Sequence, residues 1–274
     1  MPELPEVETV ATGVHARVHG QRIASVCLSR YKEPFKTSRA EMAELLTGKR
    51  IERVYREGKH IVFDLSAPSI NLAAQWIVHL GMTGRLLVSA TDVPVPEHTH
   101  AILSLSGGRE LRFVDPRRFG RLALHKIEGN AGFRGPGHEP LLISADEFVE
   151  LFRGRKLAIK AALLNQSLLH GVGNIYADES LFRAGIRPTW PAGRLSRPRL
   201  LRLRTALQEI LRKAIALGGS SVSDYVDADG RTGFFQLQHR VYLRTGCPCY
   251  ICGRPIKRIV LAGRGTHYCS HCQR

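Results

Sequence analysis

Four cysteines near the carboxyl end of the chain have the spacing of a metal site, Cys249-x2-Cys252-x16-Cys269-x2-Cys272. Each C-x2-C pair can place two thiolates on one tight turn, and two such pairs complete a tetrahedral cage of sulfur ligands. Because four protein ligands leave no coordination position open, the pattern predicts one structural Zn²⁺ rather than a catalytic metal. Cys247 is an alternative ligand, but only Cys249 gives both pairs the same spacing.

A second motif places a glycine-rich turn between two expected helices. A helix expected over 156–171 runs into the turn GVGN, and a second helix is expected to begin with Asn174 as its N-cap. Glycines let a backbone approach a ligand closely, and the free N–H groups at a helix start attract anions. Lys156 and Lys160 lie one turn apart and are expected to flank the same phosphate. Taken alone, the motif is equally consistent with an ordinary helical hairpin.

The distribution of charge favours the phosphate site. Residues 1–150 hold 19 Lys and Arg against 18 Asp and Glu, a net charge of +1. Residues 151–274 hold 21 against 6, a net charge of +15. An excess confined to one half of a chain marks a surface for a polyanion. We therefore expect the second half to bind a nucleic-acid backbone, and a purely small-molecule enzyme fits poorly.

The elements that position these residues predict an α+β fold with a β-rich half followed by a helical half. A first helix is expected from about Pro5, with a stripe of valines on one side. Short apolar runs separated by turns then predict an N-terminal β-sandwich with flanking helices. The expected divisions are the sandwich at 1–130, a Gly- and Pro-rich linker at 131–143, a helix–two-turn–helix domain at 144–235 and a zinc-finger β-hairpin at 236–274.

The ends and apolar runs of the chain indicate its compartment. The start MPELPEVETV lacks the basic and apolar regions of a signal peptide. Every apolar run is shorter than the roughly 18 uncharged residues of a membrane helix. We therefore expect a cytoplasmic protein that binds no membrane and keeps its thiols reduced for metal.

Six motifs occur together in the order of one known family. They are MPELPEVETV at the start, RxGK at 56–59, HLGMTGRL at 79–86, DPRRFG at 115–120, the GVGNIYADESLF run and the four-cysteine finger. With them, residues 2 to 273 resemble the formamidopyrimidine-DNA glycosylase family. The resemblance implies a bifunctional glycosylase and abasic-site lyase of base-excision repair. Such an enzyme removes oxidised purines, chiefly 8-oxoguanine and formamidopyrimidines, from duplex DNA and nicks the strand by β,δ-elimination. It also implies a bacterial monomer that is associated with the nucleoid through DNA.

The resemblance assigns the catalytic roles. Removal of Met1 would expose Pro2 as a secondary amine that attacks the sugar C1′ and forms a Schiff base. Glu3 would be the acid and base, and Glu6 would position the amine or the helix start. Lys59, which by itself would be a solvated turn lysine, would serve in elimination. Arg264 in the finger hairpin would grip phosphate and assist the δ step.

The same resemblance assigns the residues that handle an extruded base. Removing a base from the stack leaves a hole that must be filled. Met82, Arg117 and Phe119 would form the intercalating set, in which Arg117 also reads the orphaned cytosine. By residue type alone, Met82 and Phe119 are more often core. His98 and Lys156 would contact the DNA backbone. Residues 227–235 match a loop that covers the flipped base.

Three local departures and two alternative functions remain open. The linker GPGHEPL is longer than the family's usual GPEPL, Leu243 stands where glycine is usual, and Cys247 stands at a position that is usually not cysteine. One alternative is an endonuclease-VIII-type glycosylase for oxidised pyrimidines, against which PELPEVE at the start argues. The other is a zinc-finger protein that binds DNA without catalysis.

Overall fold

The structure is a computed structural model that describes residues 1–67, 70–127, 132–221 and 225–274. Its contacts divide the chain into two compact units. The first unit comprises Met1–Gly135 and Gly218–Phe234, and the second comprises Pro136–Leu217 and Phe235–Arg274. The finer domain boundaries expected along the sequence stay a prediction.

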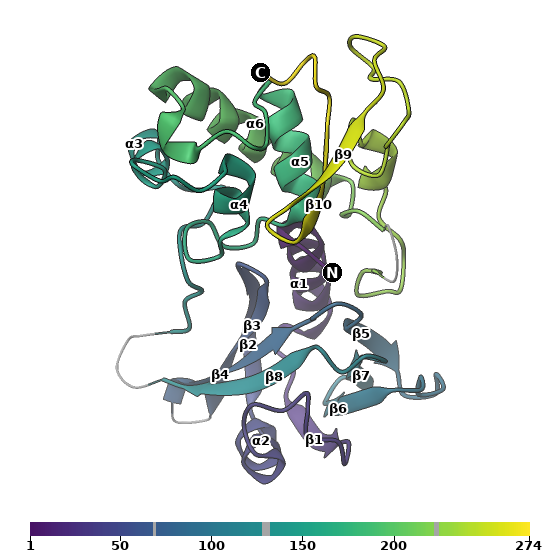
Figure 1. Ribbon diagram of the computed structural model, residues 1–274. Coiled ribbons are helices and arrows are strands. Elements are labelled where there is room, and N and C mark those ends of the chain that lie inside the picture. The colour runs from purple at the N-terminus through teal and green to yellow at the C-terminus, as the bar shows by residue number, and fades with distance from the viewer. Residues whose placement is uncertain (68–69, 128–131, 222–224) are drawn as a thin grey trace. The chain divides into compact units, whose positions relative to one another are not determined.

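Two four-stranded antiparallel sheets form most of the first unit (Figure 1). One sheet has the order β2-β3-β4-β8 and the other the order β1-β6-β7-β5. Glycines lie in two of the turns between neighbouring strands, Gly58 between β2 and β3, and Gly107 and Gly108 between β6 and β7. The strands are β1 (Ile23–Leu28), β2 (Arg50–Glu57), β3 (His60–Ala67), β4 (Ile70–His79), β5 (Arg85–Ala90), β6 (Thr99–Leu105), β7 (Arg109–Val114) and β8 (Arg121–Lys126).

Helix α1 (Leu4–Val18) connects the two sheets through one apolar core. It contacts β2 and β3 of one sheet and β5 of the other. The expected stripe of Val7, Val10, Val14 and Val18 is fully buried. A shorter helix, α2 (Arg39–Leu46), has Ser38 as its N-cap and packs against β1 (Figure 1). The predicted α+β class with a sandwich and flanking helices is confirmed.

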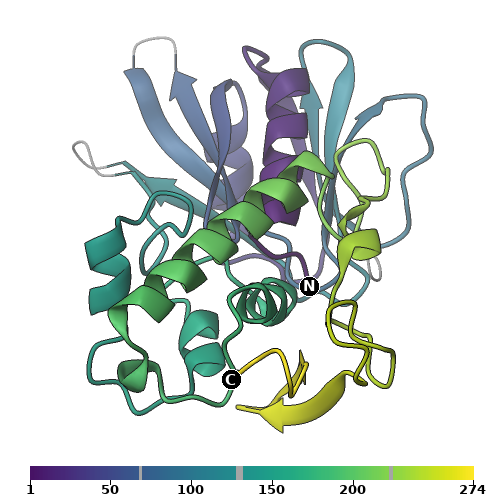
Figure 2. The same ribbon diagram turned by 90° about the horizontal axis from the view of Figure 1, so that it is seen from above.

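The second unit contains helices and a β-hairpin. The long helix α6 (Arg197–Ala216), green in Figure 2, packs on α5 (Asn174–Arg183) and α3 (Ala145–Glu150). Helix α4 (Ile159–Leu164) also contacts α5. The hairpin pairs β9 (Lys257–Leu261) with β10 (Arg264–Tyr268), and β10 packs against α5. Two short 3₁₀ turns lie at Ala192–Arg194 and Phe235–Gln238.

The expected helix over 156–171 is wrong in extent, because α4 ends at Leu164. Asn165 bonds through its side chain to the Ser167 N–H group, 3.0 Å away. Gln166 donates from its side-chain amide to the carbonyl groups of Leu164 and Val172, at 2.8 and 2.9 Å. These two polar side chains satisfy the backbone of a turn and so replace the continuing helix.

No helix in the described ranges is long and apolar enough to cross a membrane.

Candidate functional site

The start of α1 is a buried cluster of polar groups. Pro2 and Glu3 are both buried, and Glu3 is the N-cap residue of the helix. The carboxylate of Glu6 accepts the Glu3 N–H group at 2.8 Å and the Ser220 N–H group at 2.7 Å. Glu6 is 2 % exposed, so both bonds lie in a region where charge-assisted hydrogen bonds are strong. Glu6 therefore links the helix start to residue 220.

Residues 218–221 and 225–234 contact helix α1 at several points. A Cβ on Gly219, whose φ is +82°, would lie 3.0 Å from the Glu6 side chain. The Tyr225 hydroxyl donates to the Glu6 carbonyl oxygen at 3.3 Å, and burial raises the pKa of this phenol, which keeps it a donor. At the far end of α1, Arg17 forms an ion pair with Asp229. This region includes residues 227–234 of the expected base-covering loop.

Lys59 occupies the β2–β3 turn but is only 9 % exposed. A turn position suggests a solvated lysine, but this side chain is buried. His60 and His79 are paired across β3 and β4, with their rings 5.0 Å apart. Burial, then the charges of His60 and Lys59, lowers the pKa of His79 to about 4. The charge of Lys59 thus acts on the imidazole of His79, which stays neutral near pH 7.

The three residues expected to intercalate lie on two neighbouring turns. Met82 and Phe119 are 40 % and 46 % exposed, so neither belongs to the core. The guanidinium of Arg117 stacks over the Phe119 ring at 4.9 Å. A Cβ on Gly81 would lie 2.5 Å from the backbone of Phe119, which shows how closely the two turns approach.

Asp115 organises this pair of turns, and its role was not predicted. Its carboxylate accepts the Thr83 hydroxyl at 2.5 Å, the Gly120 N–H group at 2.7 Å and the Arg117 N–H group at 3.3 Å. Its N–H group donates to the carbonyl of His98, an exposed residue in a left-handed conformation with φ of 61°. Asp115 occurs in the DPRRFG motif, but only its contacts show that it joins the turns.

In the second unit, the GVGN turn lies beside the finger hairpin. Gly173 is the N-cap of α5 and Asn174 is the first helical residue, so the predicted cap is wrong by one position. The Asn174 side-chain amide donates to the Gly265 carbonyl at 3.0 Å, which holds this side chain against the finger hairpin. Arg264, next to Gly265, is exposed at the start of β10. Two residues that are 91 positions apart in sequence, Asn174 and Gly265, are thus brought together.

The two lysines before the turn have different surroundings. Lys156 is exposed, as a phosphate contact requires. Lys160 is 0 % exposed and forms an ion pair with Asp178 at 2.7 Å. The expectation that Lys160 flanks a phosphate is therefore corrected, because its ammonium group is enclosed by protein.

The four predicted cysteines converge on one point. Their sulfur atoms all lie within 4.8 Å of one another. Four sulfurs that surround Zn²⁺ at about 2.3 Å are roughly 3.8 Å apart, so the set fits this ion. Gln273 accepts the Cys269 N–H group at 2.9 Å and donates to the Ile186 carbonyl at 2.9 Å, which ties the second pair to the helical unit. These cysteines are the ligands of one structural zinc ion: Cys249, Cys252, Cys269 and Cys272.

The structure describes the local surroundings of the three departures from the family pattern, which are the linker, Leu243 and Cys247. In the linker, Gly137 has φ of +80°, and the His138 N–H group donates to the Leu168 carbonyl at 2.9 Å. Leu243 adopts φ of 57°, the conformation that glycine adopts most readily. Cys247 is exposed and lies outside the cluster of four thiols.

The sandwich, the helical unit and the four-cysteine finger define a zinc-bearing protein of α+β class. Three family descriptions match in order: the formamidopyrimidine-DNA glycosylase N-terminal domain at residues 1–122, the H2TH domain of the same enzyme at 137–226, and the zinc finger found in FPG and IleRS at 246–274.

Individual relatives match over the whole chain. The formamidopyrimidine-DNA glycosylase of Stenotrophomonas maltophilia strain K279a is 43 % identical, and the alignment covers 100 % of both chains. A Lactococcus lactis FPG variant, solved with a Fapy-dG containing DNA, has a TM-score of 0.89 and 34 % identity, with both chains covered completely. The MutM (FPG) protein of Thermus thermophilus has a TM-score of 0.85 and 40 % identity, covering 99 % of this chain and 98 % of that one. The chain belongs to the formamidopyrimidine-DNA glycosylase family.

Proposed function

We propose that this chain is a base-excision repair DNA glycosylase that removes oxidised purines from duplex DNA and cuts the strand at the resulting abasic site. The observation that carries the proposal is the buried start of α1, where Pro2 and Glu3 lie on a helix start that the Glu6 carboxylate holds through the backbone. Relatives that bear the formamidopyrimidine-DNA glycosylase name and a solved relative with Fapy-dG containing DNA support the choice of lesion.

The amine of Pro2 is the nucleophile in this proposal. Once Met1 is removed, an α-amino group with a pKa near ~7.7–8.0 is partly neutral at pH 7. Its nitrogen attacks C1′, the C1′–base bond breaks, and the base leaves with a proton. Glu3 protonates the ring oxygen as the sugar opens to the iminium. Glu6 is a positioning residue, because both of its oxygens are engaged by backbone N–H groups.

Strand cleavage follows from the iminium. It acidifies the C2′ hydrogens, so a proton is lost there and the 3′ phosphate leaves in the β step. Loss of the 5′ phosphate in the δ step completes the cut. Lys59 serves in elimination, and Arg264 grips phosphate for the δ step. The zinc ion stabilises the finger that carries Arg264, because a segment of this size buries little core of its own.

The exposed residues of both units suit contact with DNA. Met82 and Phe119 would fill the space that an extruded base leaves, and Arg117 would face the orphaned cytosine. His98, Lys156 and Asn174 would contact the backbone. We propose that the enzyme acts as a monomer in the bacterial cytoplasm and associates with the nucleoid by this DNA binding.

Borohydride trapping tests the proposal directly. The protein is incubated with a duplex carrying 8-oxoguanine opposite cytosine, and borohydride reduces any Schiff base to a stable adduct. We expect an adduct with the processed wild type, and none with Pro2→Gly or with an uncleaved N-terminal tag. Failure of the wild type, once its free N-terminus is confirmed by mass spectrometry, would support the non-enzymatic alternative. Much faster cutting of a thymine glycol duplex would instead favour the endonuclease-VIII-type alternative.

A further inference from the structure

A buried chain of polar groups connects helix α5 to Arg264. Asp178, on α5, forms an ion pair with Lys160 of α4 at 2.7 Å, and neither side chain is exposed. The Lys160 ammonium donates to the Thr266 hydroxyl at 2.8 Å, and that hydroxyl donates to the Arg264 carbonyl at 3.2 Å. Thr266 is also fully buried. These polar contacts therefore run from Asp178 to the backbone of Arg264, the hairpin residue to which the δ step is assigned.

The neighbours of this chain hold the same short stretch of β10. Lys160 also donates to the Gly265 carbonyl at 2.9 Å, and the Asn174 amide donates to the same oxygen at 3.0 Å. The second carboxylate oxygen of Asp178 accepts the His267 N–H group at 2.9 Å and its ring Nδ1 at 3.2 Å. Residues 264–267 are thus held by side chains from α4 and α5.

The finger also has attachments that do not involve this buried polar chain. Phe182 packs in one apolar cluster with Val241, Ile256 and the zinc cysteines. The buried carboxylate of Glu179 accepts the N–H groups of residues 240, 241 and 242 at 2.8–3.0 Å. A buried ion pair adds little stability because desolvation offsets its attraction, but it restricts the geometry of the groups it joins.

We propose that Asp178 and Lys160, acting through Thr266, are positioning residues that set the placement of Arg264 and Asn174 on a phosphate. The proposal rests on the proposed function, since Arg264 acts on the 5′ phosphate only if the enzyme is a lyase. Lys160 affects DNA through the hairpin backbone and not by contact.

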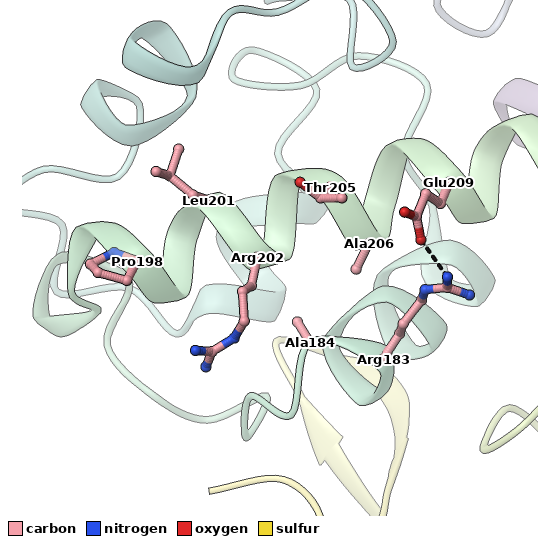
Figure 3. A pocket seen from close by; sticks show the side chains of 8 residues that line it. All are labelled: Arg183, Ala184, Pro198, Leu201, Arg202, Thr205, Ala206 and Glu209. Atoms are coloured by element: carbon pink, nitrogen blue, oxygen red, sulfur yellow. Dashed lines mark hydrogen bonds and ion pairs between the residues drawn. The ribbon is translucent and has the colours of Figure 1, made fainter.

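Two substitutions of different severity test this buried chain of polar groups. Thr266→Val is nearly isosteric, removes the hydroxyl and leaves the Lys160–Asp178 pair intact. Asp178→Asn removes the charge that pairs with Lys160. Glu209→Gln is the matched control, because it makes the same acid-to-amide change on an exposed pair with Arg183, at the edge of an open depression between α5 and α6 (Figure 3).

Each variant is assayed on a duplex with one abasic site. The measurements are the borohydride-trapped adduct, the ratio of δ to β products, the Kd for a tetrahydrofuran-containing duplex, and bound zinc. For Thr266→Val we expect a fall of roughly three- to tenfold in the δ-to-β ratio and a similar rise in Kd, as one lost buried hydrogen bond implies. Zinc content and adduct yield at saturating enzyme should match the wild type. Asp178→Asn should show a larger change in the same direction, and Glu209→Gln none.

The outcomes separate the inference from the proposed function. A wild type that forms no adduct refutes the proposed function itself. A wild type that forms adduct, with a Thr266→Val variant whose product ratio and Kd are unchanged, refutes the positioning role alone. Equal losses in zinc, adduct and both products would show a merely structural role, which also overturns the inference. If Asp178→Asn does not fold, Thr266→Val still decides.

Discussion

Gly81 is the residue at which the two intercalating turns approach each other, and Gly81→Ala tests whether that approach matters. The backbone has φ of +64°, and an added Cβ would lie 2.5 Å from the Gly120 nitrogen and the Phe119 carbonyl carbon. An L-residue in this conformation costs about 1–2 kcal/mol. Overpacking against backbone adds about 1–3 kcal/mol, because neither turn can rotate away as a side chain could. The total destabilisation expected is therefore about 2–5 kcal/mol.

Gly108→Ala separates the two contributions. Gly108 has φ of +72° in the β6–β7 turn, but an added Cβ there meets no described atom within 4 Å. This control should lose only the backbone term of about 1–2 kcal/mol. At roughly 2–4 °C per kcal/mol for a unit of this size, Gly108→Ala should lower Tm by roughly 2–8 °C and Gly81→Ala by roughly 4–20 °C.

The functional measurement is the Kd for a duplex with a tetrahydrofuran site opposite cytosine, below the melting range of both variants. Gly81→Ala should bind this duplex more weakly than Gly108→Ala, because the Met82 turn is displaced from Phe119 and Arg117. Equal melting temperatures and equal affinities for the two variants would refute the reasoning that contact with Phe119 and Gly120 fixes the Met82 turn.

Four further outcomes are expected. Leu243→Gly should raise the free energy of unfolding by up to about 1 kcal/mol in thermal melts, since φ is 57° there and the side chain is 59 % exposed; a lower stability would show that the leucine makes a contact of greater value. Chelation should release one equivalent of zinc, measured with a metallochromic dye, together with loss of DNA binding; retention of full affinity would contradict the structural role of the ion. His79 accepts the Gly81 N–H group at 3.2 Å, and its pKa of about 4 lies below the unfolded value of about 6.5, so the stability it contributes is complete above pH 6.5 and is lost as the pH falls toward 4. His79→Asn should remove this acid-side loss of stability, which amounts to up to roughly 3 kcal/mol, in pH-dependent denaturation. An unchanged pH dependence would place the titration elsewhere. DNA affinity should fall steeply with salt, with a log–log slope about 1 smaller in Arg264→Ala; a wild-type affinity independent of salt would count against the basic surface.

Local patterns in the chain already specified much of the fold. The helix starts at Ser38 and Ser144 follow from side chains that accept N–H groups three residues ahead, and such bonds need no distant partner. The cysteine spacing predicted the zinc site in the same way, because each pair forms on one turn. The valine stripe of α1 predicted which side of the helix is buried.

Tertiary contacts decided how individual site residues are placed. Lys156 and Lys160 lie one turn apart, and nothing in the sequence distinguishes them. In the structure Lys160 is buried and pairs with Asp178 of α5, whereas Lys156 is exposed. Lys59 is buried despite its charge, whereas Met82 and Phe119 are exposed despite their apolar type. Asp115 and Glu6 join segments that are distant along the chain, and no local pattern encodes which N–H groups will reach a carboxylate.

The sequence by itself thus determined the zinc ligands and the residue types available for chemistry, because these depend on composition and short spacing. It also indicated the family, through the resemblance of six motifs in order. Only the tertiary structure decided which of those residues are accessible and which hold others in position. The physical reason is that burial and hydrogen bonding between distant segments depend on how the sheets and helices pack, and a charge count or a spacing along the chain contains no information on that packing.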